Sequence, residues 1–222
     1  MSNCSLCDEF KKTHFSKLPD VKKYFEDSRI FAYNDDLCVF PTLGCFIKGY
    51  ILLSTIDHYV SSCNCPDDIV ASIEKAIPSI RACFEEKMNT GSIFFEHGTV
   101  SDFELSAASV CHFHMHFMPI DKPIFEEINS KYGFEYYGIN SLSEIKPLIA
   151  KHSITSYLLF GDYDGRIYLI NCPPNKYPSQ FLRKVMYEYY FGESDERKWD
   201  WKVDPCYDIM TATIETMGGL VI

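Results

Sequence analysis

The feature that most constrains this chain is the segment His-Phe-His-Met-His-Phe-Met-Pro at residues 112–119, where histidines alternate with large apolar residues. Successive side chains of a β-strand point to opposite faces of a sheet, so this alternation predicts a strand. His112, His114 and His116 would then share one face, while the apolar residues fill a core on the other. Three adjacent buried imidazoles would need several hydrogen-bond partners in a small volume. A solvated polar face is the alternative, but we interpret the histidines as a functional surface.

Predicted strands and helices alternate along the rest of the chain. The predicted strands are Arg29–Tyr33, Leu37–Phe40, Gly49–Ser54, Gly91–Glu96, Cys111–Pro119, Ser156–Phe160 and Arg166–Ile170. The predicted helices are residues 66–88, with a kink at Pro78, residues 178–190, and two shorter ones around a short strand within residues 123–154. This order predicts an α+β fold with a mostly antiparallel sheet, flanking helices and a C-terminal α+β extension. We expect a core over residues 1–122 and the extension, packed on that core, over residues 123–222.

Composition and charge restrict the classes of partner. The net charge is −10 over 222 residues, and the lack of a basic stripe argues against binding of duplex nucleic acid through its phosphates. A local site can still bind a small anion. The first twelve residues lack the apolar run of a secretion signal, and the longest apolar run, around residues 49–53, is too short to span a membrane. Ten cysteines without a secretion signal indicate a reducing compartment, so we expect a cytoplasmic protein without membrane contact.

Residues 112–118 resemble the signature of the histidine-triad (HIT) family, in which three histidines alternate with apolar residues. The resemblance implies a HIT-like fold and a nucleotide hydrolase or transferase. It also implies that His114 attacks the α-phosphorus, His116 contacts the same phosphate and Ser109 supplies a hydroxyl to it. Chemistry agrees, because a neutral imidazole is nucleophilic near neutral pH and a covalent intermediate divides one difficult transfer into two. Small members are usually homodimers, although the extension could occupy that surface here.

Four positions in three segments depart from the HIT pattern. Ala107-Ala108 stands where many members have Gly-Gln, so the phosphate or the leaving group must be handled differently. Within Gly49–Tyr59, which resembles a second HIT segment, Tyr50 replaces a histidine. Thr42 replaces an acid that often binds the ribose. These substitutions bear on nucleoside selectivity rather than on the triad.

Residues 93–98, Ile-Phe-Phe-Glu-His-Gly, resemble a strand end found in a subset of HIT proteins. Glu96 falls where smaller members place an asparagine near the phosphates. Because a carboxylate repels phosphate, Glu96 would bind ribose hydroxyls, orient a histidine or be structural, and we include it among the nucleotide-binding residues. His97 alternates away from Glu96 and is either a site residue or a metal ligand.

The N-terminal segment Cys4-Ser5-Leu6-Cys7 offers two thiolates, and zinc commonly binds two thiolates and two imidazoles in a tetrahedron. In several HIT members such a segment joins two histidines on zinc. By this resemblance, the ligands of a structural zinc ion are Cys4, Cys7, His58 and His112. The alternatives are an unmetallated pair of free cysteines and a rival thiolate pair in Cys63-Asn64-Cys65.

Residues 177–184 and the Trp199–Trp201 segment resemble the tail of larger HIT-like proteins, including the domain of CwfJ-type splicing factors. Gln180 is expected in the first turn of a helix, where free N–H groups favour an anion. Arg183, one turn later, adds a fixed positive charge. We therefore predict that Gln180 and Arg183 contact the nucleotide phosphates, with a solvated and capped helix face as the alternative.

The leading hypothesis is an enzyme that acts on the α-phosphate of a dinucleoside polyphosphate or nucleoside phosphoramidate through a nucleotidyl-His114 intermediate. The alternative is a nucleotide- or RNA-end-binding module with little turnover, which the CwfJ-like tail and the missing glutamine favour. A third hypothesis is a zinc-stabilised scaffold without chemistry, and the retention of all three histidines speaks against it.

Overall fold

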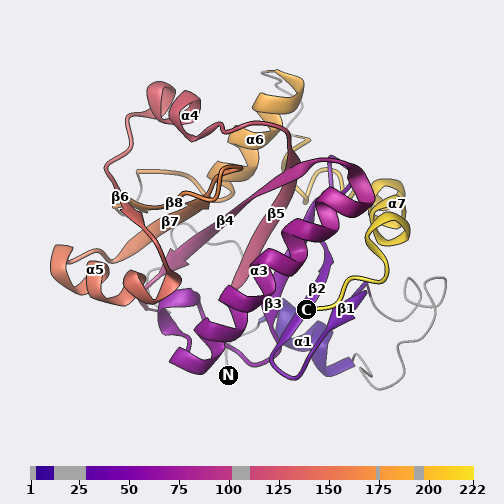
Figure 1. Ribbon diagram of the computed structural model, residues 1–222, viewed down its shortest axis with the longest axis horizontal. Helices are drawn as coiled ribbons and strands as arrows, with labels where there is room; N and C mark the ends of the chain where they lie inside the picture. Colours follow the sequence, from indigo (N-terminus) through magenta and orange to yellow (C-terminus); the bar gives the residue numbers. More distant parts are fainter. Residues whose placement is uncertain (1–3, 13–28, 102–110, 174–175, 193–197) are drawn as a thin grey trace.

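Eight strands form one sheet in the computed structural model, which describes residues 4–12, 29–101, 111–173, 176–192 and 198–222 (Figure 1). In spatial order the strands are β1 (Ala32–Tyr33), β2 (Leu37–Pro41), β3 (Ile51–Thr55), β5 (His114–Ile120), β4 (Gly91–Thr99), β7 (Ser156–Gly161), β8 (Ile167–Asn171) and β6 (Tyr136–Ile139). Every strand pair in these ranges is antiparallel. The expected α+β fold with a mostly antiparallel sheet is confirmed.

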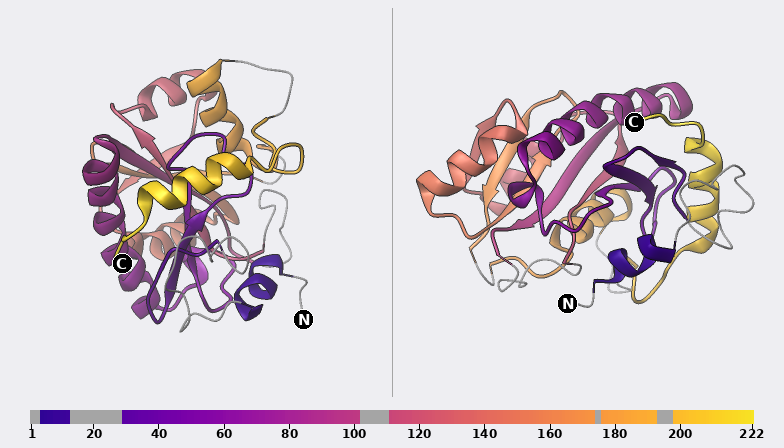
Figure 2. Two further views of the ribbon diagram at one scale, coloured as in Figure 1. Left: turned by 90° about the vertical axis from the view of Figure 1, so that its right-hand side faces the viewer. Right: turned by 90° about the horizontal axis from the view of Figure 1, so that it is seen from below.

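Helices cover both faces of the sheet. They are α1 (Ser5–Lys12), α3 (Asp67–Met88), α4 (Phe125–Tyr132), α5 (Ile145–His152), α6 (Phe181–Phe191) and α7 (Tyr207–Met217), with 3-10 turns η2 (Ser62–Asn64) and η3 (Leu142–Glu144). Buried residues of α3 and α5 share one hydrophobic cluster, and those of α4 and α6 share another. Figure 2 shows α3 on one side of the sheet and α1 and α6 on the other. Within the described ranges, none of the helices combines the length and the apolar character that a membrane crossing requires.

The alternation along the histidine strand divides its side chains between these two faces. Phe113, Met115 and Phe117 are buried in the cluster under α3, which also contains Ile80 of that helix. His116 lies on the opposite face, where Phe95 of β4 stacks on its ring at a centroid distance of 4.6 Å. The period of two predicted for this segment is therefore confirmed, and it sets the histidines against α1 and α6 rather than against α3.

The central strand β4 is paired along both edges. It pairs with β5 on one side, and on the other with β7, where Phe95 lies opposite Phe160. Strands that follow residue 122 in the chain thus continue the sheet formed by strands that precede it. The outermost strands of the sheet are the short β1 and β6.

Several elements differ from their expected bounds or shape. The strand predicted over Cys111–Pro119 begins at His114 and ends at Ile120, so His112 lies just before it. The helix predicted from Pro178 begins at Phe181, because Gln180 adopts a left-handed conformation with φ 63° that cannot continue a right-handed helix. Gln180 therefore precedes α6 instead of lying in its first turn. α3 continues without interruption through Pro78, where Ile77 and Ile80 on either side bury against the same cluster.

Candidate active site and metal-binding cluster

His114 is held in one tautomer by the backbone next to it. Its Nδ1 donates to the carbonyl oxygen of His112 at 2.7 Å, because a carbonyl can only accept. The proton is therefore on Nδ1 and the lone pair on Nε2. Burial lowers the pKa of His114, with smaller contributions from the positive charges of Arg183 and Arg29. His114 is thus a neutral imidazole with a free nucleophilic nitrogen.

His116 is fixed in the opposite tautomer by a chain of two further residues. Tyr50 lies on its Nδ1 at 2.7 Å, and Arg183 Nη1 donates to the same phenol oxygen at 3.3 Å. Burial raises the pKa of Tyr50, so the phenol stays protonated and its O–H donates a hydrogen bond to Nδ1 of His116. Burial also lowers the pKa of His116 well below its usual value. The proton of His116 is therefore on Nε2, which makes this nitrogen a hydrogen-bond donor.

A cavity of about 260 Å³ opens between α1 and α6 on the histidine face of the sheet. Its walls come from both ends of the chain and from the middle of the sheet. They are formed by Ser5, Leu6, Glu9, Arg29, Thr42, Leu43, Leu52, His97, His114, His116, Gln180, Arg183 and Trp201. The predicted residues His114, His116, Gln180 and Arg183 are brought together here.

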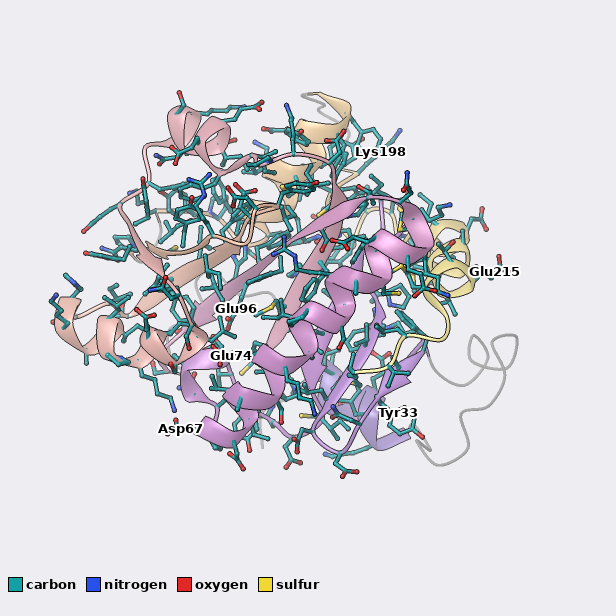
Figure 3. All side chains as sticks on the ribbon, in the orientation of Figure 1. Tyr33, Asp67, Glu74, Glu96, Lys198 and Glu215 are labelled. Carbon is teal, nitrogen blue, oxygen red and sulfur yellow. The ribbon has the colours of Figure 1, made fainter. Side chains whose placement is uncertain are left out.

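His97, and not Glu96, reaches this cavity from β4. Phe95 pairs with His116, and the same register continued sets His97 across from His114. Glu96 therefore points to the opposite face, where it accepts hydrogen bonds from the backbone N–H and the hydroxyl of Ser62 at 2.8 and 2.6 Å. Figure 3 labels Glu96 beside α3. Of the three roles considered for Glu96, the structural one fits this position, and His97 takes the place in the cavity.

Arg183 is buried, and its hydrogen bonds hold segments of the protein together instead of leaving its N–H groups free for a phosphate. All five of its N–H groups donate within the protein. Their acceptors are Thr42 Oγ1, Tyr50 Oη, Leu43 O, Gly44 O and Trp199 O, at 2.8–3.3 Å. Arg183 therefore joins α6 to the loop after β2 and to the Tyr50–His116 pair, while its charge still lies at the cavity wall.

From the sequence alone, Tyr50 and Thr42 are identified only as departures from the HIT pattern, and Trp201 only as part of the tail resemblance. In the structure Thr42 and Trp201 line the cavity, and Tyr50 orients His116. The signal available in the sequence was the replacement of polar residues by other polar residues at Thr42 and Tyr50. Ser109, predicted to bind phosphate, lies outside the described residues.

A second cluster lies beside the cavity, at the start of the histidine strand. Cys4, Cys7, His58 and His112 place their ligand atoms within 4.8 Å of one another. The Sγ atom of Cys7 lies 3.2 Å from Nδ1 of His58 and 3.4 Å from Nδ1 of His112, and Sγ of Cys4 lies 3.5 Å from the latter. Zinc bonds of about 2.3 Å to sulfur and about 2.0 Å to nitrogen imply sulfur–nitrogen edges of roughly 3.5 Å in a tetrahedron.

The donor chemistry of this cluster also fits a metal ion. Nε2 of His112 donates to the carbonyl oxygen of Thr55 at 2.8 Å, which leaves the Nδ1 lone pair facing the two thiols. Burial lowers the pKa of His112 to about 4, so the ring is neutral, as a ligand must be. The four residues therefore form a cluster that is compatible with metal binding, as the sequence predicted. Cys63 and Cys65 are not part of this cluster.

Comparison with known proteins finds one similar family and several structures of similar fold. Residues 32–133 match the family described as "Protein similar to CwfJ C-terminal". Among solved structures, a HIT family protein from Bacillus subtilis is 18% identical, with 68% of this chain and 96% of that chain covered and a TM-score of 0.40. A zinc-bound histidine triad family protein from Mycobacterium smegmatis is 16% identical, with 53% and 74% covered and a TM-score of 0.36. No curated protein matches the sequence.

The matched residues include the histidine segment and most of the strands that carry the cavity. Residues 32–133, rather less than half of the chain, are thus similar to the CwfJ C-terminal family. The match covers the region of the triad. The tail residues 177–201, which also resemble CwfJ-type proteins, lie outside it.

Proposed function

We propose that this protein is a nucleotide hydrolase or nucleotidyl transferase that uses His114 as its nucleophile. The observation that carries this proposal is the hydrogen bond from His114 Nδ1 to the His112 carbonyl, which leaves a neutral Nε2 lone pair beside a cavity. The reaction would begin when this lone pair forms a bond to the α-phosphorus of a nucleotide. The bond from phosphorus to the leaving group breaks, and its electron pair departs with that group, which takes a proton.

The second half of the reaction returns His114 to its starting state. Water or another acceptor attacks the same phosphorus, the N–P bond breaks and its electrons return to Nε2. The acceptor loses one proton. His116, with its proton on Nε2, would donate to a non-bridging phosphoryl oxygen in both steps, where negative charge develops. The substrates that fit this chemistry are dinucleoside polyphosphates and nucleoside phosphoramidates.

The cluster of Cys4, Cys7, His58 and His112 would hold a structural zinc ion. Such an ion ties flexible segments together and takes no part in phosphoryl transfer here. His112 belongs to this cluster, and the ring of Phe10 in α1 lies edge-on to it at a centroid distance of 5.5 Å. Cys4, Cys7 and Phe10 thus connect α1, one wall of the cavity, to the start of the histidine strand. Metal analysis of purified protein should find close to one zinc per chain, and a Cys7→Ser variant should lose it.

Turnover tests the enzymatic proposal directly. Incubation with labelled diadenosine polyphosphate and with adenosine 5′-phosphoramidate should release AMP, and rapid acid-free quenching should trap a nucleotide on His114. Tight binding of AMP without turnover of either compound would favour a nucleotide- or RNA-end-binding module. The match to the CwfJ C-terminal family is compatible with that second function.

A homodimer is the oligomeric state that we propose to test. A homodimer that continued the sheet would have to use β1 or β6, because both edges of β4 are already paired within the chain. Sedimentation analysis of the purified protein distinguishes a monomer from such a dimer.

A further inference from the structure

Gln180, the only glutamine in the sequence, lies in the wall of the cavity that His114 and His116 also line. It is 8% exposed and has a φ of 63°. A side chain in the left-handed region is strained relative to the right-handed region, and glycine avoids this strain. Strain of this kind collects at functional sites, where the surroundings fix the residue. A role for the Gln180 side chain itself accounts for its presence at this position.

The orientation of the Gln180 amide follows from its neighbour Asp200. Nε2 of Gln180 donates to Oδ1 of Asp200 at 3.1 Å, and the backbone N–H of Lys202 donates to the same oxygen at 3.1 Å. A carboxylate oxygen only accepts, so the amide nitrogen must face Asp200. The reverse orientation would set two acceptor oxygens against each other. The other end of the amide, Oε1, is therefore an acceptor whose direction is fixed.

This acceptor is buried and has no hydrogen-bond partner among the described residues. A buried polar atom without a partner destabilises the fold, and such atoms are rare in folded proteins. Since Gln180 lines the cavity, a molecule that enters the cavity can supply the missing donor. A phosphoryl oxygen cannot, because it carries negative charge and only accepts. The donor must be an uncharged N–H or O–H group.

We infer that Gln180 Oε1 accepts a hydrogen bond from an uncharged donor of the bound nucleotide, either an amine on the phosphorus or a hydroxyl of the ribose. This inference rests on the proposed function, because it places a nucleotide in this cavity. It changes the role expected for Gln180 from the sequence. One of the two N–H donors of its amide is held by Asp200, and the atom without a partner is the acceptor Oε1. Gln180 would therefore select a substrate by the group attached to the phosphate rather than by the phosphate itself.

Two ligand pairs distinguish the two sources of the donor. Adenosine 5′-phosphoramidate and adenosine 5′-phosphorofluoridate carry the same charge, but only the first has an N–H group on phosphorus. AMP and 2′,3′-dideoxy-AMP differ only in the ribose hydroxyls. Dissociation constants would be measured by calorimetry in a His114→Ala background, where no chemistry occurs. The matched change is Gln180→Met, which keeps the length of the side chain and removes the acceptor.

The protein with Gln180 should prefer the donor-bearing member of one pair by about tenfold, as one hydrogen bond of about 1.4 kcal/mol implies. Gln180→Met should reduce that preference to within twofold and leave the other pair unchanged, which identifies the source. Equal weakening of all four ligands, or an unchanged preference in both pairs, would overturn the inference. If none of the four ligands binds the parent protein, the proposed function fails and this inference fails with it.

A second variant keeps the test decisive if Gln180→Met does not fold. Asp200→Asn replaces the acceptor-only carboxylate by an amide that can also donate, so the Gln180 amide is free to turn its N–H₂ toward the cavity. The preference for the donor-bearing ligand should then fall although Gln180 is still present. A preference that survives Asp200→Asn unchanged would count against the fixed orientation on which the inference depends.

Discussion

The two faces of β4 and β5 both bury ionisable side chains, but they leave these side chains with different hydrogen-bonding capacity. On the α3 face, Glu96 is 1% exposed, and both of its oxygens accept hydrogen bonds from Ser62. On the opposite face, His114 and His116 each have one ring nitrogen fixed by the protein. Their second nitrogens have no partner among the described residues and lie beside a cavity.

Burial shifts the pKa on both faces, upward for Glu96 and downward for the histidines. A shifted pKa therefore reports burial on either side of the sheet and does not identify a site by itself. The two faces differ in that His114 and His116 each keep one oriented ring nitrogen without a hydrogen-bond partner among the described residues. Variants of His114 should change activity without changing stability, and variants of Glu96 should do the reverse.

The largest expected effect comes from His114→Ala. Loss of a covalent nucleophile lowers kcat by a factor of about 10⁴ or more, whereas this half-buried ring contributes little to the core. The unfolding temperature should stay within about 2 °C, equivalent to at most about 1 kcal/mol. Met115→Leu, on the opposite face of the same strand, is the matched control and should keep its activity. If steady-state AMP release survives in His114→Ala, the histidine face would not be the functional face of the sheet.

Arg183→Met should give the next largest effect, and on stability. It deletes five hydrogen bonds and leaves buried carbonyl oxygens, such as that of Gly44, without donors. Breaking a buried charged network of this kind costs about 3–5 kcal/mol in the free energy of unfolding. Urea unfolding measures this loss. Lys184→Met, at the exposed neighbouring position, should change the unfolding free energy by less than about 0.5 kcal/mol. Equal losses of unfolding free energy in both variants would contradict the structural role of Arg183.

Glu96→Gln tests the other face through pH. Burial raises the pKa of Glu96 from 4.5 to about 7, so the folded protein binds this proton more tightly than the unfolded chain does. The wild-type protein should therefore lose up to about 3 kcal/mol of unfolding free energy as the pH rises from about 4.5 to about 7. The glutamine side chain of the variant cannot ionise, so the variant should not show that loss.

The measurement is the difference in unfolding free energy between Glu96→Gln and the wild-type protein across this pH range. It should grow in favour of the variant as the pH rises, while AMP release at pH 7 stays within about twofold. A difference that is constant with pH, or a large loss of activity, would place Glu96 on the functional side of the comparison.

Tyr50→Phe should have the smallest effect. It removes the hydroxyl that fixes the Nε2–H tautomer of His116, and one lost hydrogen bond of about 1–1.5 kcal/mol corresponds to about a tenfold lower kcat. The affinity for AMP should change less than kcat if the contact acts mainly on the developing charge. A variant with unchanged kcat would show that His116 does not need this orientation.

Local patterns in the sequence were enough for part of the site. The alternation at residues 112–117 predicted both the strand and the common face of its histidines, because a period of two leaves no other arrangement. The cluster of Cys4, Cys7, His58 and His112, which the structure brings together, was predicted from the resemblance to HIT members with an N-terminal Cys-x-x-Cys. Spacing alone offered the two thiols and did not select the two histidines.

The face of Glu96 could not be predicted in the same way. Residues 93–95 are apolar and are buried on both faces, so the pattern of β4 does not say which face meets the histidines. That choice depends on the pairing of Phe95 with His116, a contact between strands. The five hydrogen bonds of Arg183 depend in the same manner on the packing of α6 against a loop far away in sequence.

The cavity that lies between α1 and α6 has a consequence for the order of events in folding. Leu6 and Trp201 both line it, so its walls close only when the two most distant parts of the chain have met. Contacts of such long range form late, because the intervening chain must be ordered before they stabilise anything. During synthesis, the strand that carries His114 would emerge well before α6. The growing chain would thus have its reactive histidine early and gain the ability to hold a nucleotide only after α6 has been made.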